Sequence, residues 1–126
     1  MTLLSRIRNR IAYNRLEWWQ RYSVQMNPEG FTISEVRPND APLVTSVSWS
    51  QISSIIFLDG GLASDQFFVY LSGEENAICV PVEAEGGSRF WDELRERGLF
   101  PQEVSGLAVR SSIRGAVFEW PPKGTA

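Results

Sequence analysis

The sequence contains no histidine. Histidine is the usual general base near neutral pH and the commonest imidazole ligand of protein-bound metals. Its absence excludes Ser-His-Asp and Cys-His catalysis and every zinc site that needs an imidazole. An enzyme would have to use carboxylates, lysine, tyrosine or a lone thiol. We therefore expect a protein that is not an enzyme and that needs neither cofactor nor metal.

Cysteine and long apolar runs are also scarce. The one cysteine, Cys79, excludes an intrachain disulfide and fits a reducing compartment. The chain has no run of about 18 apolar residues, which a membrane-spanning helix requires. Its basic start lacks the apolar segment and cleavage site of a signal peptide. We expect a cytoplasmic protein, with peripheral membrane association as the alternative.

Composition fits one globular domain, but charge is distributed unevenly. The 126 residues are 43% hydrophobic and 21% charged, as is ordinary for a folded domain of this size. Residues 1–22 hold five arginines and one glutamate, a net +4, whereas the remainder holds seven basic and fourteen acidic side chains, a net −7. The pI is about 5.0, and the basic residues gather in one short segment. This pattern argues against nucleic acid as a partner.

The N-terminal segment, residues 1–17, has the pattern of an amphipathic helix. At about 100° per residue its aliphatic side chains fall in one arc with arginines at the edges. Arginines beside an apolar stripe, followed by Trp18 and Trp19, are typical of a helix that lies on anionic lipid. We expect the stripe to pack on the chain's own domain or on a second copy, giving a homodimer, and contact with a membrane or a frayed segment are the alternatives. The candidate membrane-contact residues are Leu4, Ile7, Arg8, Ile11 and Arg15.

The middle of the chain alternates like β-strands. Residues 18–26 and 31–36 are predicted to form a hairpin, because Asn27-Pro28-Glu29-Gly30 has the residues of a tight turn. Further strands are expected over residues 44–49, 52–58, 65–72 and 77–82. In the first of these, Thr45, Val47 and Trp49 form the predicted buried face.

One helix is expected over residues 88–97. Ser88 is the predicted N-cap, and Gly98 suits the left-handed position after the helix. Leu99 should then contact Leu94. Residues 106–110 and 115–120 are interpreted as added strands and residues 121–126 as a frayed tail, so that residues 18–120 form a single domain.

Several short runs carry a family resemblance: Gly30-Phe31-Thr32-Ile33, Val47-Ser48-Trp49-Ser50-Gln51-Ile52, Asp65, Val80-Pro81-Val82 and Phe90-Trp91-Asp92-Glu93-Leu94. Over residues 20–100 the chain resembles the small bacterial proteins of the pleckstrin-homology-like (PH-like) superfold. The resemblance implies an α+β fold, with a strongly bent antiparallel sheet or partial barrel capped by the helix. It also implies binding or scaffolding. No basic phosphoinositide-type cluster appears in the strand loops.

The main functional hypothesis is a non-catalytic protein-binding or scaffolding module that uses Trp18, Trp19 and Trp49, because aromatic residues are enriched at interfaces. A peripheral membrane protein docked by its N-terminal helix is the second hypothesis. A toxin-neutralising immunity protein is the third, based on the acidic residues 23–126. Asp59 and Asp65 are interpreted as turn residues, since calcium loops need more oxygen ligands. Cys79 is interpreted as a small buried hydrophobe.

Overall fold

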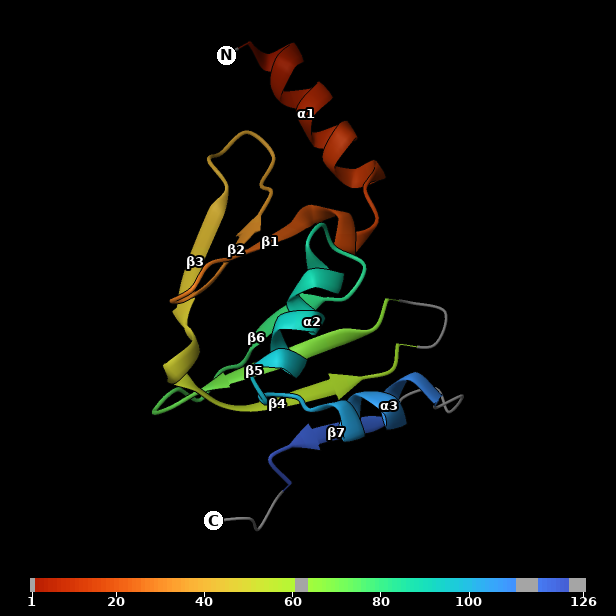
Figure 1. Cartoon of the computed structure of the whole chain (residues 1–126). Coiled ribbons are helices and arrows are strands. Elements are labelled where there is room, and N and C mark those ends of the chain that lie inside the picture. The colour runs from red at the N-terminus through yellow and green to blue at the C-terminus, as the bar shows by residue number, and fades with distance from the viewer. Residues whose placement is uncertain (1, 61–63, 111–115, 123–126) are drawn as a thin grey trace.

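The structure is a computed structural model that describes residues 2–60, 64–110 and 116–122. It combines helices with antiparallel strands, which confirms the α+β class (Figure 1). In chain order the elements are α1 (Leu3–Arg15), the 3₁₀ helix η1 (Trp18–Arg21), β1 (Tyr22–Met26), β2 (Gly30–Glu35), β3 (Leu43–Ser48), the 3₁₀ helix η2 (Trp49–Gln51), β4 (Ile52–Leu58), β5 (Gln66–Leu71), β6 (Ile78–Pro81), α2 (Gly87–Glu96), α3 (Gln102–Arg110) and β7 (Val117–Trp120).

The strands form two antiparallel sheets. One has the order β1-β2-β3, and the other has the order β6-β5-β4-β7. The chain passes from the first to the second through η2, the short corner that begins at Trp49. Within the described residues the two sheets do not join into a closed barrel.

The predicted β1–β2 hairpin is confirmed. The Asn27 side-chain oxygen accepts hydrogen bonds from the backbone N–H groups of Glu29 and Gly30, both at 2.9 Å, which fixes the turn. Gly30 then begins β2 opposite Ser48 of β3. A Cβ atom at Gly30 would lie 1.8 Å from the carbonyl oxygen of Val47, so only glycine allows β2 and β3 to approach this closely.

The core lies between the two sheets and α2. Phe90 of α2 is fully buried, and its ring centroid lies 4.8 Å from that of Phe31 in β2 and 6.0 Å from that of Phe67 in β5. Phe57 of β4 and Phe100, which follows α2, extend this aromatic cluster. Helix α2 therefore joins one sheet to the other through side-chain packing.

The end of α2 was predicted correctly and its start was not. The N–H of Gly98 donates to the carbonyl of Arg95, and the N–H of Leu99 donates to that of Leu94, as in a Schellman ending. Gly98 has a φ of +70°. At the other end, Ser88 lies inside the helix and Gly86 is the N-cap, with a φ of +83°. The backbone at the N-cap is left-handed, a conformation that glycine adopts freely and serine only at an energetic cost, so the helix begins after Gly86 and not after Ser88.

Two strand predictions were also wrong. Residues 18–21 form η1, in which Glu17 and Gln20 cap each other, so that β1 starts only at Tyr22. Residues 106–110 belong to α3, since Val104, Ser105 and Ala108 share one helical face directed at the core. A short apolar run fits the two-residue period of a strand and the 3.6-residue period of a helix equally well, and here contact with the core favours the helix. Of the strand expected over residues 115–120, residues 117–120 are confirmed as β7, paired with β4, whereas residue 115 and positions 123–126 of the expected tail lie outside the described residues.

Gly86 and Gly73 offer a matched test of the packing beneath α2. Both have a positive φ, but a Cβ at Gly86 would lie 2.0 Å from the Val24 carbonyl oxygen, whereas a Cβ at Gly73 would meet nothing within 4 Å. Gly73→Ala should cost about 1–2 kcal/mol of unfolding free energy from backbone strain alone. Gly86→Ala should cost more, about 2–5 kcal/mol, because overpacking against Val24 adds to the same backbone strain. Urea unfolding of both variants measures this, and equal losses would contradict the proposed clash.

Candidate functional site

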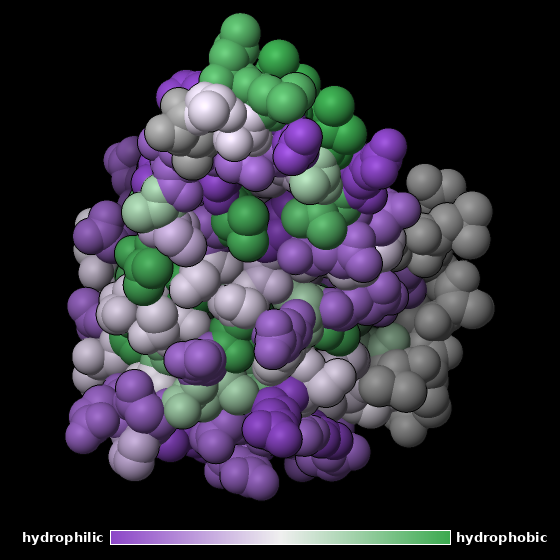
Figure 2. Space-filling model, turned by 90° about the horizontal axis from the view of Figure 1, so that it is seen from above, coloured by the Kyte–Doolittle hydropathy of each residue, from purple (hydrophilic) through white to green (hydrophobic). Residues whose placement is uncertain are grey.

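Helix α1 exposes an apolar stripe formed by Leu3, Leu4, Ile7 and Ile11. Their exposed fractions lie between 47% and 75%, and none of the residues Leu3–Arg15 is buried. The helix projects from the body of the molecule at the top of Figure 1. Figure 2 looks down on this face, where hydrophobic side chains gather at one margin beside strongly hydrophilic ones. The interpretation that the stripe packs on the chain's own domain is therefore wrong.

Arginines line both sides of the apolar stripe. At about 100° per residue, Arg8 and Arg15 follow one edge of the stripe and Arg6 and Arg10 follow the other. Helix α1 contains no acidic residue. The predicted contact residues Leu4, Ile7, Arg8, Ile11 and Arg15 are thus brought together on one surface, and the structure adds Leu3, Arg6 and Arg10 to it.

The opposite face of α1 meets the loop between β2 and β3. Asn9, Ala12, Tyr13 and Leu16 line a cleft whose other wall is formed by residues 36–41. These four positions lie roughly half a turn from the apolar stripe at about 100° per residue. The body of the protein therefore holds the helix by its less apolar side and leaves the stripe facing outwards.

Asn39 fixes the helix to this loop. Its side-chain oxygen accepts a hydrogen bond from the Asn9 amide at 3.0 Å, and its own amide donates to the Arg6 carbonyl at 3.1 Å. Asn39 has a φ of +67°, a left-handed conformation that asparagine tolerates better than most residues. One loop residue thereby contacts the helix at two points.

Arg21 holds the other end of α1. Its guanidinium carbon lies 4.2 Å from the centre of the Tyr13 ring, a cation–π contact. The same guanidinium donates weak hydrogen bonds to the carbonyls of Tyr13 and Leu16, at 3.5 and 3.4 Å. Carbonyls at a helix C-terminus carry partial negative charge, so a cation there stabilises the helix. Arg21 and Asn39 together set the direction in which the stripe points.

The three predicted partner-binding tryptophans lie in different surroundings. Trp18 and Trp19 are half-buried in η1, at the foot of α1, with ring centroids 6.1 Å apart. Trp49, in contrast, is a core residue with 8% exposure, and its indole N–H donates to the Asn27 carbonyl at 3.0 Å. Its ring packs beside Phe31 and Phe90. Trp49 is therefore buried, as the alternation of its segment predicted, and its ring is not exposed to a partner.

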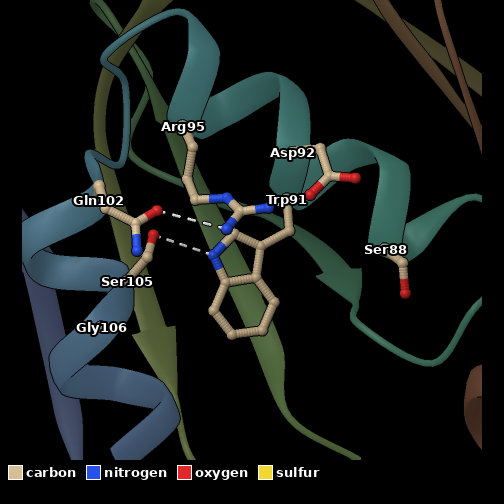
Figure 3. Close-up of a pocket in the computed structure, with 7 residues that line it drawn as sticks. All are labelled: Ser88, Trp91, Asp92, Arg95, Gln102, Ser105 and Gly106. Atoms are coloured by element: carbon tan, nitrogen blue, oxygen red, sulfur yellow. Dashed lines mark hydrogen bonds and ion pairs between the residues drawn. The ribbon is translucent and has the colours of Figure 1, made fainter.

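A pocket between α2 and α3 has no counterpart in the sequence predictions. It encloses about 440 Å³ and is lined by Ser88, Trp91, Asp92, Arg95, Gln102, Ser105 and Gly106 (Figure 3). The Trp91 indole donates to the buried Ser105 hydroxyl at 3.1 Å, and Arg95 pairs with Asp92. Residues 106–110 were expected as a strand, so this helix–helix pocket could not be foreseen. Asp92, Arg95 and Ser105 already have partners within the chain, and the pocket lining does not identify a ligand.

Asp65 and Cys79 are held by contacts within the chain. The Asp65 carboxylate accepts a hydrogen bond from the Gly60 N–H at 2.9 Å, as expected of a turn residue. Within residues 2–60, 64–110 and 116–122, no group of three or more cysteine, aspartate or glutamate side chains could hold a metal ion. Burial raises the pKa of the Cys79 thiol to about 11, and its sulfur lies 2.9 Å from the Gln66 side-chain oxygen. The thiol is therefore protonated near neutral pH.

No family model, curated protein or solved structure matches this chain. None of the helices in the described parts of the chain combines the length and apolar character that crossing a membrane requires. The surface of α1 is thus the feature on which a functional argument depends.

The raised pKa of Cys79 predicts slow alkylation. Each pH unit below the pKa reduces the reactive thiolate about tenfold. The shift from 9.0 to about 11 should slow reaction with iodoacetamide at pH 8 about 100-fold relative to the urea-unfolded chain. The rate should still be rising at pH 10, where the unfolded chain has levelled off. Equal rates for folded and unfolded chains at pH 8 would show that the thiolate is not suppressed.

Proposed function

We propose that this protein docks peripherally on anionic membranes through helix α1. The observation that carries the proposal is the outward-facing apolar stripe of α1, flanked on both sides by arginines. A helix in the plane of a membrane interface inserts its apolar face and keeps cationic side chains at headgroup level. Helix α1 has this arrangement, and its other face contacts the loop of residues 36–41.

The charges favour an anionic surface. Arg6, Arg8, Arg10 and Arg15 lie on a helix without acidic residues, while residues 23–126 carry the net negative charge of the chain. A basic residue near an anionic membrane contributes about 1 kcal/mol, so the four arginines could supply up to about 4 kcal/mol. Burial of a leucine or isoleucine adds up to about 1.5–3 kcal/mol when it is complete. Because the two contributions are comparable, loss of either should weaken docking.

The rest of the domain is, in this proposal, a scaffold of PH-like architecture that presents α1. Support comes from the order of elements, in which six antiparallel strands precede α2, and from the packing of α2 against both sheets through Phe90. The polar contacts of Asn39 and Arg21 hold α1 in a defined direction without burying it.

A non-catalytic protein-binding module is the second candidate function. Trp18 and Trp19 favour it, since they lie half-buried beside the foot of α1 and could extend an interface with an acidic partner. In that case the same arginine-flanked stripe would bind a protein and not lipid, and the protein would not float with vesicles.

Vesicle flotation tests the proposal. The full chain should float with vesicles that contain phosphatidylserine and not with purely zwitterionic ones, and binding should fall as salt is raised. Ile7→Asp should weaken binding at least about tenfold, because it removes apolar area and adds a charge repelled by the membrane. Arg8→Gln should weaken it about fivefold, which corresponds to about 1 kcal/mol.

Matched controls lie elsewhere on the surface. Leu107 in α3 is 52% exposed, close to the 47% of Ile7, so Leu107→Asp controls for a new charge on an exposed aliphatic residue. Arg89→Gln in α2 controls for loss of an exposed arginine. Both variants should float like the unchanged protein. Failure of the full chain to bind anionic vesicles at low salt would overturn the proposal in favour of a protein partner.

A further inference from the structure

A second group of exposed hydrophobic residues lies at one end of the β1-β2-β3 sheet. Apart from those on α1, the large exposed hydrophobic residues among the described positions are Val36, Leu43, Val44, Leu107 and Val117. Val36 directly follows β2, and Leu43 and Val44 begin β3, which is paired with β2. Clustered exposed apolar residues mark interaction surfaces more often than scattered ones do.

Strand β3 is a sheet edge without the usual protection. It pairs with β2 over its whole length with no register shift, and with no other strand among the described residues (Figure 1). Leu43–Ser48 contains no charge and no proline, the devices by which proteins commonly block edge strands. The opposite edge of the same sheet is covered, because the Val24 N–H of β1 donates to the Glu85 carbonyl at 2.8 Å.

The register identifies the backbone groups that β3 leaves unpaired. The Trp49 N–H, directly after β3, donates to the Glu29 carbonyl on the β2 side. Backbone groups along an antiparallel strand point to alternate sides, so those of Thr45 and Val47 face β2, and those of Val44 and Ser46 face outwards. The Ser46 hydroxyl lies 3.1 Å from that of Thr32, as expected for a closely spaced, non-hydrogen-bonded pair.

Both ends of this open edge are closed. Pro42 precedes β3 and has no N–H to donate. At the other end the Ser48 N–H also points away from β2, and it donates to the Gln51 side-chain oxygen at 2.8 Å. The open backbone groups are therefore those of Val44 and Ser46, on either side of Thr45.

We propose that β3 pairs with β3 of a second copy of this chain, antiparallel and centred on Thr45. A two-fold axis through the Thr45 pair places Val44 opposite Ser46 of the second copy and Ser46 opposite its Val44, so every open group finds a partner. The pairing ends at Pro42, which has no N–H, and at Ser48, whose N–H is already bonded to the Gln51 side chain. The strand is uncharged, so pairing with itself brings no like charges together. The three strands of each copy then form one continuous sheet.

This interface does not depend on the membrane proposal, because it uses neither α1 nor its arginines. The outer faces of Val44 and Ser46 are exposed, so side chains there can be exchanged without disturbing the core. That exposure permits a test of both the interface and its register.

Sedimentation velocity from micromolar to millimolar protein should show a reversible dimer. Val44→Lys with Ser46→Lys places like charges opposite each other across the axis, and it should raise the dimer dissociation constant at least about tenfold. Val44→Lys with Ser46→Glu places opposite charges there and should restore the dimer, more strongly at low salt. Ser46→Pro removes an open N–H and should give a monomer, whereas Ser46→Ala, which loses only the contact with Thr32, should remain dimeric.

Thermal unfolding of each variant verifies that it is folded. The proposal is overturned if the unchanged protein is monomeric throughout this concentration range, or if folded Ser46→Pro dimerises as before. It is also overturned if the two charge variants behave alike, because the register centred on Thr45 requires them to differ. Loss of the dimer in Ile7→Asp but not in Ser46→Pro would assign self-association to α1 instead.

Discussion

The packing of Phe90 between the two sheets is the contact on which the rest of the structure depends. Phe31 and Phe67 belong to different sheets that share no strand, and the Phe90 ring touches the aromatic cluster of both. Large aromatic side chains bury much apolar area, and edge-to-face contacts add to it. Gly87 allows this approach, since a Cβ there would lie 2.2 Å from the Val82 carbonyl oxygen. Without α2, each sheet would expose its inner face.

This arrangement of the core determines which surfaces remain available. Phe31, Phe57, Phe67, Phe90 and Phe100 fill the space between sheets and helix, and Trp49 closes one side. Helix α1 contributes no buried residue and is held by polar and cation–π contacts from Asn39 and Arg21. The apolar stripe of α1 is therefore not part of the core. The edge of β3 is likewise separate from the core except at Val47.

Features set by neighbouring residues could be predicted from the sequence. The turn at Asn27–Gly30 and the ending at Gly98 follow from side chains and backbone preferences within a few positions. The amphipathic pattern of α1 identified Leu4, Ile7, Arg8, Ile11 and Arg15 as one surface, and these residues do lie together. Residues 106–110 were misassigned because a short apolar run satisfies both the strand and helix periods. The N-cap at Gly86 depends on the close approach of β1, which local sequence does not reveal.

The sequence by itself determined the α+β class, the β1–β2 hairpin, the C-terminal end of α2 and the existence of an arginine-flanked stripe on α1. Periodicity and turn chemistry act over a few residues, so one chain segment contains all the information they need. Only the tertiary structure decided that α1 turns its stripe away from the body, that Thr45 is exposed, and that β3 is an open edge. Each of these features depends on how segments far apart in the sequence pack against one another, as the Phe90 ring packs against that of Trp49. Contacts of this kind are set only when the whole chain has folded.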